Sequence, residues 1–338
     1  MLDKLEYLYG EPAVKGLYKQ SDADFFVKED LGYELDGEGE HVFINIQKQN
    51  CNTLFVAEQL AKFAGISPKL VGYAGLKDRN AITEQWFGLH IPGKLTPDFS
   101  LFTLDGCKIL QVKRHTKKLR IGNLKGNFFS LVLRDVDNQA EAEQRLNFIQ
   151  ASGVPNYFGE QRFGKDNNNI TQAMLWAKGE ISVKDRKKRS FYLSAARSAI
   201  FNGIVSKRIK QKLNTTVLCG DILQLVDRGS WFVAEQLELE TLQQRVMNNE
   251  LNITAPMLGD NGPQTKDEAL SFEQQYIDNN WSEFLTLFKQ ERMETSRRSS
   301  LLRPKNINWT WQDSKTLQVE FWLPAGSYAT AVLRELIS

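Results

Sequence analysis

Cysteine and histidine are scarce in this sequence, with three of each among 338 residues. The cysteines are far apart and odd in number, so they predict neither a disulfide framework nor a cysteine-type zinc site: Cys51, Cys107 and Cys219. No stretch approaches the roughly 20 apolar residues of a membrane-spanning helix, and the first ten residues lack a signal-peptide core. We therefore expect a soluble, cytoplasmic protein with reduced thiols and no membrane partner.

Motifs of several common enzyme classes are also missing. The sequence has no Walker-type glycine loop, no strand-linked G-x-G-x-x-G, no H-x-x-x-H pair and no G-x-S-x-G elbow. Kinase, dehydrogenase, zinc hydrolase and serine hydrolase functions therefore lack support, and the three histidines, His41, His90 and His115, are separated in sequence. A reaction driven by one carboxylate in a basic, aromatic cleft, without metal or cofactor, remains chemically possible.

Apolar and charged residues are present in ordinary globular proportions, 41% and 25%. The length suffices for two domains of about 150 residues each. The net charge is only +2, but residues 107–134 hold eight Lys and Arg and residues 186–212 hold nine, with no Asp or Glu in either window. This segregation favours a surface that binds a polyanion such as nucleic acid over a merely solvated face.

Asp78 is the candidate catalytic residue. Residues 71–74 and 82–91 have the pattern of strands, and Gly75 interrupts them, so Asp78 is predicted on the loop between two strands. Lys77 and Arg79 flank it, and two cations would keep a partly buried aspartate ionised and ready to act as nucleophile or base. Asp78 can also be a simple turn residue, because aspartate forms local hydrogen bonds in turns.

Three further segments contain polar or aromatic side chains to consider. Phe25 begins an alternating strand, and a basic segment leads through a glycine turn into another strand, so we expect Lys125, Asn127 and Phe129 at the mouth of a cleft. There Asn127 would offer an amide to a base edge and Phe129 a stacking face. Tyr328 would lie in the first turn of a helix capped by Ser327. Each residue also has a structural explanation, as a core aromatic or turn residue.

The element pattern indicates that both strands and helices are present and that they are unevenly distributed along the chain. Strand patterns occupy the first 150 residues and return at residues 316–323, whereas residues 170–212 and 235–291 have a helical pattern. This distribution predicts an α-rich domain that is inserted into a discontinuous, strand-rich one.

Five segments together resemble one family, the TruD-type tRNA pseudouridine synthases. They follow the order of that family and span nearly the whole chain: DFFVKED, GLKDRNAITEQW, LKGNFFSLVLRDV, PNYFGEQRF with SFYLSAARSAIFN, and FWLPAGSYATAVLREL. The resemblance implies an α/β (α+β) fold, in which a pseudouridine-synthase catalytic domain over residues 1–152 and 303–338 has a mixed, mostly antiparallel sheet flanked by helices. It also implies an α-rich TRUD domain inserted over residues 153–302.

The resemblance also implies an activity. Such enzymes isomerise uridine to pseudouridine at position 13 of tRNA, in the D-stem region, without metal or cofactor. The family's catalytic aspartate falls on Asp78, and its base-contacting positions fall on Phe25, Asn127, Phe129 and, less closely matched, Tyr328. The supporting roles of Lys77 and Arg79 are an electrostatic inference from this sequence. The order of bond making around the sugar stays open, by attack at C1′ or by a glycal.

Two other functions are compatible with parts of the pattern. A non-catalytic RNA-binding protein explains the basic windows and the aromatics, with Asp78 as a structural residue. A magnesium-dependent nuclease needs a second clustered acid, and Glu84 is the one acidic residue near Asp78 in sequence.

Overall fold

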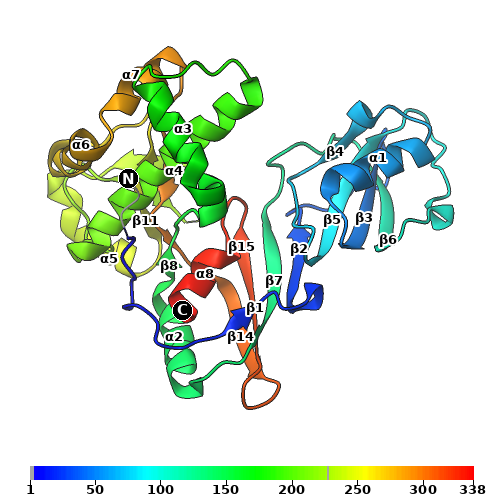
Figure 1. Ribbon diagram of the computed structural model, residues 1–338, viewed down its shortest axis with the longest axis horizontal. Coiled ribbons are helices and arrows are strands. Elements are labelled where there is room, and N and C mark those ends of the chain that lie inside the picture. The colour runs from blue at the N-terminus through cyan, green and yellow to red at the C-terminus, as the bar shows by residue number, and fades with distance from the viewer. Residues whose placement is uncertain (1–3, 227) are drawn as a thin grey trace. The chain divides into compact units, whose positions relative to one another are not determined.

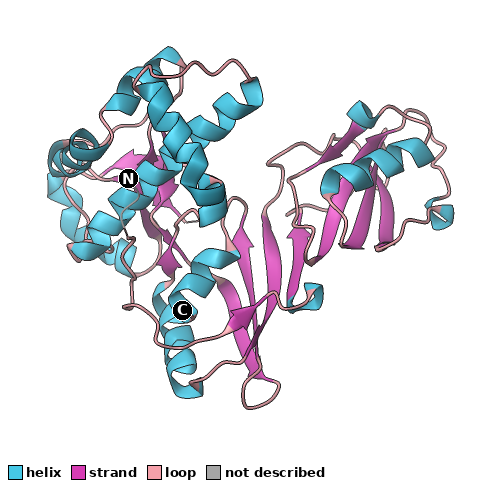
Figure 2. Ribbon diagram, in the orientation of Figure 1, coloured by secondary structure: helices cyan, strands magenta, loops and turns pink. Residues whose placement is uncertain are grey.

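The computed structural model describes residues 4–226 and 228–338, which fold as two compact units (Figures 1 and 2). Unit 1 comprises the residues up to Pro12, Ala151–Arg303 and Thr330–Glu335. Unit 2 comprises Ala13–Gln150, Pro304–Ala329 and Leu336–Ser338. The assignment of residues 1–152 with 303–338 to a catalytic domain, and of residues 153–302 to an inserted TRUD domain, stays a prediction.

Unit 2 is built on one nine-stranded sheet whose main path runs β14-β15-β7-β2-β5-β3-β6. Its strands are β1 (Leu17–Tyr18), β2 (Phe25–Asp30), β3 (His41–Gln49), β4 (Val71–Tyr73), β5 (Ile82–His90), β6 (Cys107–His115), β7 (Gly126–Arg134), β14 (Lys305–Trp311) and β15 (Leu317–Pro324). β1 pairs with β7, and β4 pairs with β5. The pairing of β2 with β5 is parallel and the other pairings are antiparallel, which confirms the predicted mostly antiparallel sheet.

The two faces of this sheet are covered differently. Helix α1 (Thr53–Phe63) packs its apolar side on one face, against Val42, Ile44 and Phe87 of β3 and β5. A smaller cluster around Trp86 and Leu119 covers the other face. Helix α2 (Gln139–Ser152) follows β7.

Leu119 anchors the loop between β6 and β7 to the second face. A Cβ atom at Gly72 would lie 2.3 Å from the Leu119 carbonyl oxygen, so only glycine permits this approach. The Gly122 amide also donates to the Ala74 carbonyl at 2.8 Å. The loop between β6 and β7 is therefore held against β4, the strand that leads to Asp78.

Unit 1 contains most of the remaining helices and two small sheets. The helices are α3 (Asn168–Ala177), α4 (Arg186–Lys210), α5 (Leu239–Met247), α6 (Asp267–Asn280), α7 (Glu283–Gln290) and most of α8 (Ala329–Leu336). One sheet has the order β10-β9-β11-β12 and the other pairs β13 with β8. Their strands are β8 (Val154–Pro155), β9 (Ile222–Leu225), β10 (Trp231–Val233), β11 (Leu251–Met257), β12 (Ser296–Ser299) and β13 (Leu301–Leu302).

Two expectations for this unit were wrong in detail. Residues 170–212 form two helices, because Gly179 adopts φ +75° just after α3 and Asp185 caps α4 by accepting from the Lys188 amide. The region 235–291 was predicted to be helical, but it contains the central strand β11. Leu251, Ile253 and Ala255 and their neighbours are almost all buried, so the two-residue alternation that marks a half-exposed strand is absent.

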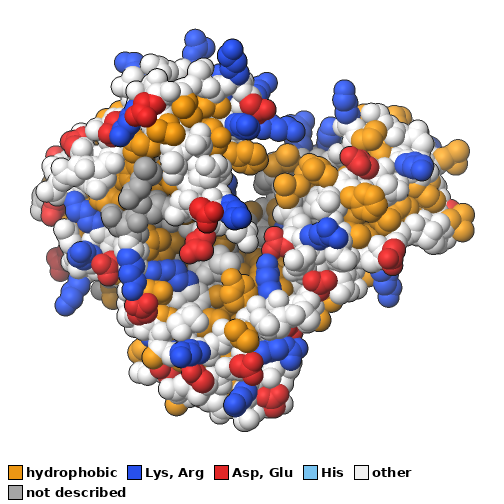
Figure 3. Space-filling model, in the orientation of Figure 1, with side chains coloured by type: hydrophobic (Ala, Val, Ile, Leu, Met, Phe, Trp, Pro, Cys, Tyr) orange, Lys and Arg blue, Asp and Glu red, His pale blue; other side chains and the backbone are white. Residues whose placement is uncertain are grey.

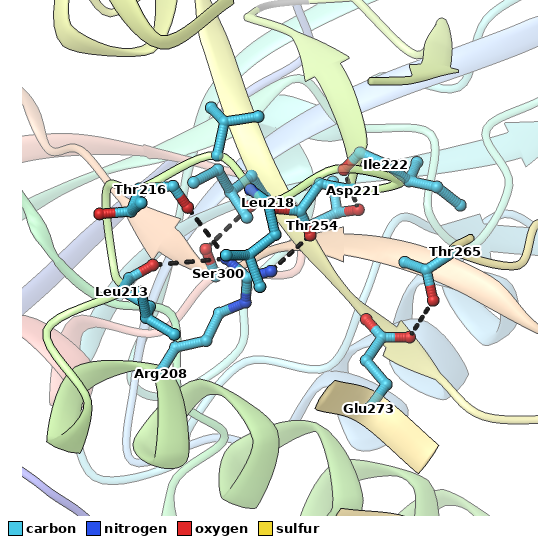
Figure 4. A network of polar contacts seen from close by, with 12 residues as sticks. Arg208, Leu213, Thr216, Leu218, Asp221, Ile222, Thr254, Thr265, Glu273 and Ser300 are labelled. Atoms are coloured by element: carbon cyan, nitrogen blue, oxygen red, sulfur yellow. Dashed lines mark hydrogen bonds and ion pairs between the residues drawn. The ribbon is translucent and has the colours of Figure 1, made fainter. Parts of the chain in front are cut away.

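A buried ion pair links α4 to the four-stranded sheet of unit 1, next to the start of β9 (Figure 4). Arg208 of α4 donates to Asp221, which also accepts from the Leu218 amide at 2.8 Å. Both charged side chains are fully buried. Burial raises the pKa of the Asp221 carboxyl, against the opposing effect of Arg208. Arg208 belongs to the second basic window, and its burial in this pair removes it from the polyanion-binding surface that the window predicted.

Candidate active site

Asp78 lies on the loop between β4 and β5, as predicted, and buried side chains hold this loop. Three consecutive loop residues contact the segment 50–53 or the end of β3. The Lys77 amide donates to Thr53 Oγ1 at 3.0 Å, the Asp78 carbonyl accepts from Lys48 Nζ at 3.0 Å, and Arg79 Nε donates to Asn50 Oδ1 at 2.9 Å. The loop has no regular backbone structure, so these contacts define its position.

The Asp78 carboxylate is paired with Lys19, a residue that the sequence analysis missed. Lys19 Nζ lies 2.6 Å from Asp78 Oδ2, and it also lies 4.0 Å from the centroid of the Phe25 ring. Lys19 stands between β1 and β2 with φ 57°, in the left-handed region that favours glycine. The Asp78 side chain is 48% exposed, more than the partly buried aspartate that we expected.

Lys77 and Arg79 flank Asp78 in sequence but direct their side chains elsewhere. Lys77 Nζ donates to Asn127 Oδ1 at 2.6 Å and lies 3.2 Å from Glu29 Oε1. Arg79 bonds to Asn50, as described above. Lys77 therefore supports the predicted base-contacting amide, and Arg79 supports the loop.

Glu29 is a second residue that the sequence analysis missed. It is buried on β2, where its Oε2 accepts from the Trp86 amide at 2.8 Å. Burial raises the pKa of the Glu29 carboxyl, and the Lys77 ammonium opposes this shift. Because Lys77 occupies Asn127 Oδ1, the Asn127 Nδ2 group is left as a donor with no protein partner among the residues described.

The strand register brings Asn127 and Phe129 together with β2. Val27 lies opposite Phe129 and Glu29 opposite Asn127, and directly opposed residues share a face of the sheet. The Phe25 and Phe129 rings meet edge to face at 6.3 Å, and Phe129 stacks on Phe321 at 5.5 Å.

The two phenylalanines are less accessible than an open stacking surface. Phe25 is 6% exposed and Phe129 is 7% exposed, so both contribute to the core while they border the site. The expectation that Phe129 stands at a cleft mouth rather than in the core was therefore wrong for the described structure. Lys19 covers part of the Phe25 ring.

Tyr328 immediately precedes α8 rather than lying in its first turn. It follows the turn after β15, where the Ala325 amide donates to the Lys125 carbonyl at 3.0 Å, two residues before Asn127. The structure therefore brings Phe25, Asn127 and Phe129 to one face beside the Asp78 loop and places Tyr328 just beyond the turn that follows β15.

The cations of the first basic window fall into two groups, those that bond within the protein and those that have no ion-pair partner among the residues described. Arg114 donates to the carbonyls of Gly39 and Leu95 at 2.7 Å, and Arg134 pairs with Asp24 at 2.7 Å. Lys117, Lys118 and Arg120 of the window line a hollow of about 610 Å³, here called the basic hollow. Its other lining residues are His41, Ile121, Gly122 and Asn123. On the face shown in Figure 3, cationic and anionic side chains are interspersed, in keeping with the net charge of +2.

Acidic residues do not gather around Asp78 in the described chain. Glu84 lies on β5 beside Thr83, so its side chain points to the other face, where it pairs with Lys28 at 3.6 Å. Within residues 4–226 and 228–338, no group of three His, Cys, Asp or Glu is arranged to hold a metal ion. No helix in the same ranges is long and apolar enough to cross a membrane.

Comparison with solved structures defines the class of fold. The chain is similar to the crystal structure of a putative tRNA pseudouridine synthase D (TruD) from Methanosarcina mazei, with a TM-score of 0.72 and 21% sequence identity. The match covers 98% of this chain and 95% of that chain, and it shows that the fold is shared.

The sequence also matches the model of the family described as tRNA pseudouridine synthase D (TruD), over residues 1–184 and 176–336. The chain belongs to the TruD family of tRNA pseudouridine synthases, and the predicted family is thereby confirmed. It is an enzyme that isomerises uridine in tRNA.

Proposed function

We propose that this protein converts uridine 13 of tRNA, in the D-stem region, to pseudouridine, with Asp78 as the catalytic carboxylate and with no metal or cofactor. The observation that carries the proposal is the environment of the Asp78 carboxylate. It is accessible, it lies on a loop held by hydrogen bonds, and it pairs at 2.6 Å with Lys19, whose ammonium also contacts the Phe25 ring. Localisation in the cytoplasm stays part of this proposal.

The ion pair suggests how the two carboxylate oxygens are used. Lys19 contacts Oδ2, and Oδ1 has no protein partner among the described residues, so Oδ1 is free to meet the sugar. In the reaction, the bond from C1′ to N1 breaks, a bond from C1′ to C5 forms, C5 loses its proton, and N1 gains one. The change is redox-neutral. Asp78 either attacks C1′ or removes a sugar proton to give a glycal, and both routes need an ionised carboxylate.

Asn127 is suited to recognise the base. Its Oδ1 accepts from Lys77, which orients the amide so that Nδ2 is the group available to a ligand. An N–H donor matches a carbonyl oxygen of uracil, whereas cytosine has an amino group at C4. We assign Asn127 to this contact and Lys77 to fixing the amide orientation, with Arg79 holding the loop.

The apolar residues would receive the base after it leaves the RNA stack. Unstacking a base costs a few kcal/mol, and contact with aromatic side chains offsets about 1 to 3 kcal/mol of it. Phe25 and Phe129 border the Asp78 loop, and Tyr328 lies beyond the adjacent turn. Because Lys19 lies over Phe25, a stacked uracil would have to share or replace that position.

Tritium release from tRNA tests this function. Isomerisation frees the hydrogen at C5, so tRNA that contains uridine tritiated at C5 releases label only when the new bond forms. We expect wild-type protein in EDTA to release tritium, and Asp78→Asn and Asp78→Ala to release none while binding tRNA normally. Release by Asp78→Asn at the wild-type rate would overturn the role of Asp78, and loss of wild-type release in EDTA would overturn metal independence.

A further inference from the structure

Lys48 is a fully buried cation behind the Asp78 loop. It lies on β3, between Thr83 of β5 and Cys107 of β6, and its side chain has no exposed surface. No carboxylate lies within ion-pairing distance of its ammonium in the described part of the chain. Taking an ammonium out of water without an anion costs several kcal/mol, so its remaining contacts carry unusual weight.

Those contacts are two backbone carbonyls from the segments that meet behind the site. Lys48 Nζ donates to the Asp78 carbonyl at 3.0 Å and to the Cys51 carbonyl at 2.9 Å. The ammonium therefore bridges the residue that bears the candidate catalytic carboxylate and the segment that leads into α1. The bridge starts from β3, a strand that is paired on both sides, with β5 and with β6, and regular elements hold functional groups more precisely than loops do.

The face of the sheet explains why a lysine at this position reaches the loop. Lys48 lies opposite Thr83, which lies opposite Val27, which lies opposite Phe129. These four residues form one row across β3, β5, β2 and β7, on the same face as Asn127. Burial lowers the pKa of Lys48, and the neighbouring Asp78 acts in the opposite direction.

We propose that Lys48 is a positioning residue for the Asp78 carboxylate. By holding the Asp78 carbonyl, its ammonium fixes the backbone from which the carboxylate projects, and it adds positive charge beneath the loop. The inference rests on the proposed function of Asp78. A displacement of about 1 Å at a reacting group can cost about 10²-fold in rate, so removing this hydrogen bond has a large effect on chemistry.

Lys48→Met tests the proposal, because methionine approximates the length of the side chain and lacks the donors. The rate of tritium release in a single turnover and the Kd for tRNA are measured at a temperature where the variant is folded. We expect the rate to fall about 10- to 100-fold while the Kd changes less than about threefold. Lys28→Met is the matched control, since it removes a lysine whose side chain is 56% exposed on β2, a strand of the same sheet. This control should retain the wild-type rate.

A second readout does not depend on activity. Amide hydrogen exchange of residues 75–81 should accelerate in Lys48→Met, with little change in α1 and in the other strands. Lys48→Gln, which retains an N–H donor group, serves if Lys48→Met does not fold, and it should lie between wild type and the expectation for methionine.

The outcomes separate the two proposals. A folded Lys48 variant with the wild-type rate, or one whose rate and tRNA binding fall equally, would overturn the positioning role. If wild-type protein itself releases no tritium, the proposed function fails and the role of Lys48 falls with it. If wild-type protein releases tritium and Asp78→Asn does not, a Lys48→Met variant with the wild-type rate contradicts only the inference on Lys48.

Discussion

At the scale of single residues, Lys19 is the main electrostatic partner of Asp78. Its ammonium contacts one carboxylate oxygen at 2.6 Å and covers part of the Phe25 ring. Fixed charges that stabilise reacting groups are among the largest contributions to catalysis, at about 10²- to 10³-fold each. The pair therefore links the carboxylate that we propose to be catalytic to the side chain against which the base is proposed to lie.

We predict that Lys19→Met lowers the single-turnover rate of tritium release by about 10²-fold, because the variant lacks the charge that orients Asp78 Oδ2. Binding of tRNA should be nearly unchanged. Lys15→Met, which removes an exposed lysine four residues earlier, provides the comparison. Wild-type activity in Lys19→Met would show that the ion pair has no catalytic weight.

The sequence predicted the position of Asp78 but not its environment. The loop was predictable because strand patterns flank it, and the contact residues Phe25, Asn127 and Phe129 followed from the family resemblance. Lys19 and Lys48 were not predictable, since they are 59 and 30 positions away and meet Asp78 only through strand pairing. Adjacent cations were the visible local signal, and the fold directs them to Asn127 and Asn50 instead.

At the scale of elements, the strand β2 is joined to β7 by an ion pair as well as by backbone bonds. Asp24, just before β2, is buried and accepts a bifurcated hydrogen bond from Arg134 Nε and a second hydrogen bond from its Nη2. Hydrogen bonding by Arg134 lowers the pKa of the Asp24 carboxyl, and burial opposes this shift. Because Phe25 follows directly, this contact also fixes one wall of the site.

A lowered pKa predicts a definite pH dependence. The Asp24 contribution to stability is fully present above the unfolded-state pKa of about 3.9, and it is lost as the pH falls through the lower folded-state pKa. Unfolding by urea, measured from pH 6 to pH 3, should therefore give a shallower decline for Asp24→Asn than for wild type. Equal slopes for the two proteins would contradict this assignment.

In unit 1, the buried pair of Arg208 and Asp221 should be critical for folding. Asp221→Ala leaves an uncompensated buried arginine, which costs about 3 to 5 kcal/mol. Glu250→Ala removes the partner of Arg245 in an exposed pair of the same unit, and it should cost less than about 1 kcal/mol. Urea denaturation measures both, and similar losses in the two variants would refute the distinction.

The strands illustrate which elements are readable from sequence. β4, β5 and β15 were predicted close to their bounds, at residues 71–74, 82–91 and 316–323, because their side chains alternate or flank clear turns. β11 was missed because its residues are buried on both faces. The split between α3 and α4 depends on a glycine and a capping aspartate inside a region whose overall composition is helical.

At the scale of the whole molecule, the two basic windows of the sequence contain more cations than the folded protein leaves available to a polyanion. Arg114, Arg134, Arg197 and Arg208 bond to protein carbonyls or carboxylates rather than facing an RNA. The candidate polyanion-binding surface is therefore limited to the exposed cations of the windows. Those in the basic hollow have no ion-pair partner in the described part of the chain.

We predict that Lys118→Gln with Arg120→Gln weakens tRNA binding and lowers its salt dependence. For each cation that binds a phosphate, its removal should reduce the slope of log K against log salt concentration by about 0.7 to 0.9. Lys62→Gln, on the exposed side of α1, is the control that should leave both quantities unchanged. An unchanged slope in the double variant would remove the basic hollow from the RNA-binding surface.

The most direct test of the central claim uses tRNA in which only uridine 13 carries tritium at C5. Wild-type protein in EDTA should release one tritium per tRNA, and Asp78→Asn should release none while it binds the same tRNA with unchanged affinity. A second tRNA labelled only at uridines outside position 13 should release none with either protein. Release from the second tRNA, or from the first by Asp78→Asn, would contradict the account.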